Sequence, residues 1–166
     1  MGFQEVGFFS YSLGSLRACI AALIHPGLFD FGVLHLIAND FAEALMHGVG
    51  TRHIAHQIEG MIEPELLTLI LKTISPGAYG NLLHKLPHAT RIVQAGYDYV
   101  FRKPNVDAFT DKVLRVRKDA EVEIANLSHD TFSSFPRGYL VMLRNIRFIY
   151  AHTFMKKYKR SHLFGI

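Results

Sequence analysis

The alternation of strand-like and helix-like segments is the feature that most restricts the fold of this chain. Val6–Phe9 is a short apolar run, and Ser15–Ile24 repeats apolar residues at the three- and four-residue spacing of a helix. Phe29–Ala38 is a second apolar run with little alternation, as expected of a strand that is covered on both faces. The order strand, helix, strand predicts a parallel α/β sheet.

The same alternation returns in the second half of the chain. Thr90–Gln94 and Ala120–Ala125 are expected strands, and Val106–Arg117 between them is an expected helix. A further helix is expected over residues 138–155, after Phe135-Pro136, with apolar residues dense enough for a docking face. The fold class predicted from the whole chain is therefore α/β.

Residues 39–88 interrupt this alternation, because they contain no β-branched run long enough for a strand. Three short amphipathic stretches are expected there, at 41–46, 54–61 and 64–73. Ser75-Pro76-Gly77 is an expected loop. We therefore expect a single domain over residues 1–166, with residues 39–88 as a helical insertion within it.

The composition suits a folded chain whose charge gathers near its C-terminal end. The 166 residues are 49% hydrophobic and 19% charged, which supports a real core and argues against disorder. The formal net charge is +4, and six of the eighteen Lys and Arg residues fall between Arg144 and Arg160. A nucleic-acid interface would spread such charges over a face between aromatics, so no nucleic-acid partner is expected.

The apolar stretch between residues 18 and 38 is not expected to span a membrane, because it contains Pro26 and Asp30. The only cysteine, Cys19, lies in an apolar helix-like run, where a buried thiol is the usual state. One cysteine excludes an intrachain disulfide and is compatible with a reducing compartment, so a cytoplasmic location is expected.

A serine between small residues, Ser10-Tyr11-Ser12-Leu13-Gly14, follows the first expected strand and precedes the first expected helix. This is the arrangement of a nucleophile elbow, in which a tight turn exposes the serine hydroxyl. The helix then directs the Leu13 backbone N–H toward the oxygen that becomes charged. Ser10 departs from the glycine usual at that position, and a helix N-cap role for Ser12 is the alternative.

An acid and a histidine follow the later strands in the order that such a serine needs. Asp98 comes after the strand-like run that ends in Ala95-Gly96-Tyr97, and His129 comes after Asn126-Leu127-Ser128. The order serine, acid, histidine is that of the α/β-hydrolases, and parallel sheets place their sites at the carboxyl ends of strands. Asp130 is the alternative acid, but its side chain should point away from the imidazole.

Residues 90–131 resemble the last two strands of an α/β-hydrolase, and residues 6–38 resemble its fifth strand, elbow, following helix and sixth strand. The resemblance implies that Ser12 is the nucleophile, Asp98 the orienting acid, His129 the general base and Leu13 an oxyanion donor. It also implies that residues 39–88 form the cap or lid, and that no cofactor and no metal is needed.

The family has further strands before the nucleophile strand, and this chain has about five residues there. We therefore expect only the C-terminal half of the fold, without the loop that supplies the second oxyanion N–H. Strand 6–9 then has an exposed apolar edge, which is expected to pair with another chain or a second copy.

The leading hypothesis is a serine hydrolase that cleaves a carboxylic ester or related acyl bond of a small molecule through an acyl-enzyme on Ser12. The alternative is a truncated, non-catalytic module with a binding or structural role. Thioesterase and haloperoxidase-like chemistry are not separated from esterase chemistry by the sequence. A metal site at His47, His53, His56 and Glu59 is a further, weaker alternative.

Overall fold

Four parallel strands form one sheet, in the spatial order β1-β2-β3-β4. The computed structural model describes residues 5–163. The strands are β1 (Gly7–Tyr11), β2 (Phe31–His35), β3 (Ala89–Tyr97) and β4 (Glu121–Ser128). Each strand pairs in parallel with the next one along the chain, which confirms the predicted parallel α/β class.

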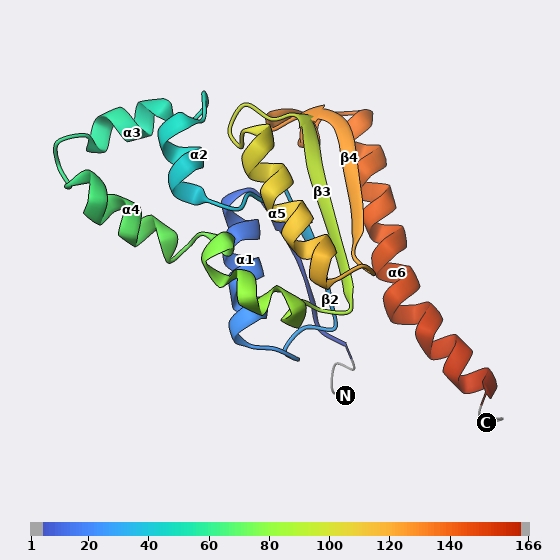
Figure 1. Cartoon of the computed structure of the whole chain (residues 1–166). Coiled ribbons are helices and arrows are strands. Elements are labelled where there is room, and N and C mark those ends of the chain that lie inside the picture. Colours follow the sequence, from blue (N-terminus) through green and yellow to red (C-terminus); the bar gives the residue numbers. More distant parts are fainter. Residues whose placement is uncertain (1–4, 164–166) are drawn as a thin grey trace.

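Helices cover both faces of the sheet (Figure 1). On one face lie α1 (Leu13–Ile24) and α5 (Lys103–Val116), with the 3₁₀ helix η1 (Pro76–Lys85) in contact with both. The long helix α6 (Arg137–Leu163) packs on the other face, against β2 and β4. Because α1 and α5 make their crossovers on the same face, each new strand is added on the same side of the previous one.

The main core lies between the sheet and the α1–α5 layer. Its fully buried members include Leu16 and Leu23 of α1, Leu34 of β2 and Phe109 of α5. The opposite face has a smaller apolar cluster of Val33, Ala89 and Phe148, and next to it a layer of buried polar side chains. Arg91, His35 and Asn145 belong to that layer, which joins the sheet to α6 by hydrogen bonds.

The predicted insertion contains three short helices, α2 (Phe41–His47), α3 (Arg52–Ile58) and α4 (Pro64–Lys72). The Asp40 carboxylate caps α2 by accepting hydrogen bonds from the backbone N–H groups of Ala42 and Glu43. The three helices extend to one side of the sheet in Figure 1. Ala42 and Leu45 of α2 and Leu71 of α4 form a small core, and Ile58 of α3 packs against it. The rest of the insertion does not extend away from the sheet. The 3₁₀ helix η1 begins at Pro76, where a loop was predicted over residues 75–77, and its Leu83 lies in the main core.

Several elements are longer than the sequence pattern predicted. β3 and β4 continue to Tyr97 and Ser128, and α6 starts at Arg137 and is traced to Leu163. Side chains beyond residue 153, which carry part of the predicted basic cluster, lie outside the described set. Within residues 5–163, no helix combines the length and apolarity needed to cross a membrane.

Candidate active site

Ser12 occupies the tight turn between β1 and α1. Its backbone has φ 52° and ψ −123°, a strained combination for a residue with a side chain. The Ser12 N–H donates to the His35 carbonyl oxygen at 3.0 Å, which fixes the turn to the end of β2. Ser12 stands at the N-cap position of α1, but its side chain makes no capping hydrogen bond within the described chain.

Ser10, which stands where a nucleophile elbow usually has glycine, is accommodated by hydrogen bonds. Its hydroxyl donates to the Val33 carbonyl oxygen at 3.0 Å and accepts from the Ser15 hydroxyl at 3.2 Å. The Ser15 hydroxyl also lies 2.6 Å from the His35 carbonyl oxygen. Both hydroxyls therefore have backbone carbonyl oxygens as partners under the turn, and the departure from glycine does not block it.

The structure brings Ser12, His129 and Asp98 together. The Ser12 Oγ lies 2.9 Å from His129 Nε2, and His129 Nδ1 lies 3.0 Å from both carboxylate oxygens of Asp98. The side chains of His129 and Asp98 are 9% and 4% exposed. An ionised carboxylate only accepts hydrogen bonds, so this contact assigns the ring proton to Nδ1 and leaves Nε2 free to accept from the serine hydroxyl.

The Asp98 carboxylate is held by the chain that follows it. Its Oδ1 accepts hydrogen bonds from the backbone N–H groups of Val100 and Phe101, both at 2.8 Å. Asp130, the alternative acid, instead accepts a hydrogen bond from the Tyr99 hydroxyl. The imidazole therefore contacts Asp98 through Nδ1.

Strand ends explain this convergence. Ser12, Asp98 and His129 are the residues that directly follow β1, β3 and β4. The carboxyl ends of parallel strands meet at one edge of a sheet, where such folds place their sites. Leu13 begins α1, so its backbone N–H is one of the four at a helix start that have no partner within the helix.

Aromatic rings surround the imidazole of His129. The ring centroids of Phe101, Tyr11 and Tyr99 lie 5.4, 5.8 and 6.2 Å from that of His129. Tyr11 also donates a hydrogen bond from its hydroxyl to the His129 backbone oxygen. Tyr11 and Tyr99 were not among the residues predicted from the sequence. The only signal that could have indicated them is that Tyr11 directly precedes Ser12 and Tyr99 directly follows Asp98.

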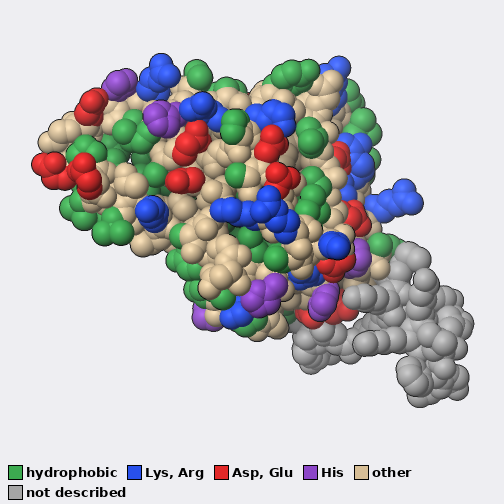
Figure 2. Space-filling view, viewed as in Figure 1, with side chains coloured by type: hydrophobic (Ala, Val, Ile, Leu, Met, Phe, Trp, Pro, Cys, Tyr) green, Lys and Arg blue, Asp and Glu red, His purple; other side chains and the backbone are tan. Residues whose placement is uncertain are grey.

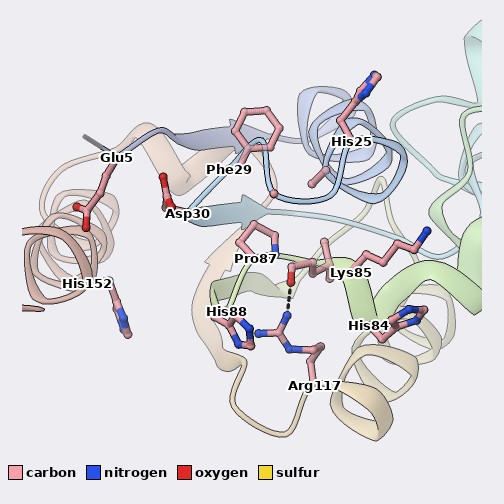
Figure 3. A pocket seen from close by; sticks show the side chains of 13 residues that line it. Glu5, His25, Phe29, Asp30, His84, Lys85, Pro87, His88, Arg117 and His152 are labelled. Carbon is pink, nitrogen blue, oxygen red and sulfur yellow. Dashed lines mark hydrogen bonds between the residues drawn. The ribbon is translucent and has the colours of Figure 1, made fainter. Parts of the chain in front are cut away.

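A cavity of about 660 Å³ lies away from Ser12, Asp98 and His129 (Figure 3). His25, His84 and His88 line it, but they point in different directions. Arg117, which also lines it, is already bonded to the Leu86 carbonyl oxygen and to Asp119. The cavity lies near the amino ends of β2 and β3 and contains no member of the serine site.

The histidines of the insertion do not assemble a metal site in the described part of the chain. His56 Nδ1 lies 3.0 Å from Glu59 Oε2, and both side chains are mostly exposed. Among the described residues, no three His, Cys, Asp or Glu side chains are grouped as metal ligands would be. The geometry gives this alternative no support.

Solved structures share the fold of this chain, although at the level of sequence no family model and no curated protein matches it. Pyrococcus horikoshii acylaminoacyl peptidase is similar with a TM-score of 0.66 and 15% identity, over 89% of this chain and 23% of that one. Carboxyl esterase 2 of the mycorrhizal fungus Tuber melanosporum gives 0.64 and 22%, over 87% of this chain and 52% of that one. Porphyromonas gingivalis dipeptidyl peptidase 4 gives 0.64 and 18%, over 87% and 19%.

The chain thus spans between about a fifth and about half of the length of these proteins. It corresponds to their C-terminal portion. This chain contributes four parallel strands with flanking helices to the match. The chain therefore has the α/β-hydrolase fold.

Proposed function

We propose that this chain is the catalytic part of a serine hydrolase that cleaves a carboxylic ester or a related acyl bond. The observation that carries the proposal is the continuous hydrogen-bonded series from Ser12 Oγ through His129 to Asp98, at 2.9 and 3.0 Å. The strained turn at Ser12 supports it, because backbone strain of this kind is concentrated at functional sites.

The geometry suits acyl transfer through a covalent intermediate. His129 Nε2 removes the proton of Ser12 while Oγ attacks the acyl carbon, and Asp98 stabilises the imidazolium that forms. The Leu13 N–H stabilises the negative oxygen of the tetrahedral intermediate. His129 then protonates the leaving alcohol, and in the second half it activates the water that releases the acid.

The helices of the insertion favour an apolar acyl group. Met61, Leu66 and Leu69, on and before α4, are each more than half exposed. Figure 2 shows apolar side chains gathered over the α3–α4 region, with acidic groups between them. We therefore propose residues 39–88 as the cap, with α2–α4 providing its apolar surface. The similar structures include a peptidase and an esterase, and both of these enzyme classes act at acyl carbons.

The edge strand β1 is proposed as a site of association. Its sequence Gly-Phe-Phe-Ser-Tyr has no charge and no proline, and the Phe9 side chain is 43% exposed. In natural proteins, charged residues or proline on an edge strand usually prevent it from pairing with a strand of another chain. β1 has neither. We therefore expect β1 to bind a strand of another polypeptide or of a second copy.

Labelling by a fluorophosphonate probe tests the hydrolase proposal, because such probes phosphonylate only activated serines. We expect Ser12 of the wild-type chain to be labelled, as mapped by peptide mass spectrometry, and expect no labelling of Ser12→Ala. Ser134→Ala is the matched control, since that serine lies outside the site, and it should be labelled like the wild type. A folded wild-type chain that stays unlabelled would overturn the proposal and favour a non-catalytic module.

A further inference from the structure

We infer that Tyr11 is a positioning residue that holds His129 over Ser12, through the hydrogen bond from its hydroxyl to the His129 backbone oxygen. This inference rests on the proposed function, because it assigns Tyr11 a role within the same site. The residue before the serine would then be part of the site rather than a spacer in the turn.

The need for such a tie follows from the strand order. β1 and β4 are the two edges of the sheet, with β2 and β3 between them. Three spacings of about 4.8 Å separate the ends of β1 and β4 by roughly 14 Å. His129 directly follows β4, so the segment that carries it must bend toward β1 for its side chain to reach Ser12. A bond from Tyr11, the last residue of β1, fixes that segment on the far side of the gap.

Packing supports the same role. The Tyr11 ring meets the rings of His129 and Phe132 edge to face, with centroids 5.8 and 6.2 Å apart. Phe132 belongs to η2 (Asp130–Ser133), the short helix that directly follows His129. The ring therefore touches both the imidazole and the segment that carries it.

The hydroxyl is suited to act as a permanent donor. Burial raises the pKa of Tyr11, and the carboxylates of Asp130 and Asp98 act in the same direction. The phenol thus keeps its proton throughout the neutral range, and a backbone oxygen can only accept. The next residue, Asp130, is held by a separate hydrogen bond, which the Tyr99 hydroxyl donates to its carboxylate.

The test compares Tyr11→Phe with Tyr79→Phe. Phe keeps the ring packing of Tyr11 and removes only the hydroxyl. Tyr79 is a matched control because its hydroxyl also donates to a backbone oxygen, that of Thr73 at 3.0 Å, and it lies outside the serine site. The first readout is the rate constant of phosphonylation at Ser12. The second is the proton resonance of the His129 Nδ1–H in chains with ¹⁵N-labelled histidine, which reports the bond to Asp98 without any need for turnover.

We expect Tyr11→Phe to slow phosphonylation roughly 3- to 10-fold, the effect of losing one hydrogen bond at a site. The His129 Nδ1–H resonance should shift or broaden in this variant, with unchanged far-UV circular dichroism. Tyr79→Phe should match the wild type in both readouts. Equal rates and an unshifted resonance in Tyr11→Phe would overturn the inference, as would equal slowing in Tyr79→Phe. A wild type with neither labelling nor this resonance would overturn the proposed function itself.

Discussion

His35 makes the stability of the fold sensitive to acid. It ends β2 beneath α6, is 3% exposed, and its Nε2 lies 2.8 Å from the amide nitrogen of Asn145. Arg91 Nε donates to the Asn145 oxygen at 2.9 Å, so the amide must offer its NH₂ group to His35. The ring nitrogen therefore accepts, and it can do so only while it is unprotonated. Protonation of His35 would break this bond in a buried site.

The size of the effect follows from the pKa of His35. Burial is the largest cause of the shift, and the pKa falls from the ordinary 6.5 to about 4. Because the folded pKa is the lower one, the unfolded chain binds the proton first, and stability falls as the pH drops. The contribution of neutral His35 to the free energy of unfolding is about 3 kcal/mol. It is fully present above pH 6.5 and is lost progressively down to pH 4.

Urea unfolding of the wild type and of His35→Gln, measured between pH 7 and pH 4, tests this reasoning. Gln does not titrate, and its amide oxygen can accept from Asn145. The contributions of groups that titrate in both proteins cancel when the free energy of unfolding of one protein is subtracted from that of the other. From pH 7 to pH 4, we expect the free energy of unfolding of the wild type to fall by about 3 kcal/mol relative to that of His35→Gln. A difference that stays flat would refute the argument.

Two further pairs of substitutions test the packing and the edge. Gly48→Ala should lower the free energy of unfolding by about 1–3 kcal/mol, because the added Cβ would lie 2.4 Å from the Val100 backbone oxygen. Gly14→Ala, where that carbon meets nothing within 4 Å, should be neutral or stabilise α1 by up to ~1 kcal/mol; urea unfolding that ranks the two alike would contradict this. Phe9→Lys should reduce association in sedimentation velocity, while Phe135→Lys, an equally apolar but more exposed control, should not; equal sedimentation of the Phe9 variant and the wild type would exclude β1 as the interface.

The sequence pattern predicted the fold class and the grouping of Ser12, Asp98 and His129 because these depend on local signals. Each residue follows a strand-like run, and parallel strands bring their carboxyl ends to one edge. The polar layer under α6 was not predictable in this way. Arg91 and Asn145 are 54 residues apart, and nothing near either of them indicates that they bond. The loop predicted at Pro76 was wrong for a similar reason, since η1 gains its stability from contacts with α1 and α5.

The end of β4 shows how the site depends on one residue of register. Ala95 pairs with Ala125, but Tyr97 pairs with Ser128, so two steps along β3 match three along β4. This extra residue is a β-bulge, and it places Asp98 level with His129. The predicted strand ended at Ala125 because a bulge breaks the alternation on which the prediction relied.

Deletion of Ser128 should therefore remove the site while leaving the sheet. Without Ser128, His129 takes the position opposite Tyr97, and its side chain points to the other face because the period of a strand is two. His129 would then turn away from Asp98 and Ser12, and fluorophosphonate labelling should be lost. Ser128→Ala keeps the chain length and should be labelled like the wild type. A deletion variant that folds, as judged by circular dichroism, and labels at the wild-type rate would show that the segment after β4 positions His129 independently of the register of the sheet.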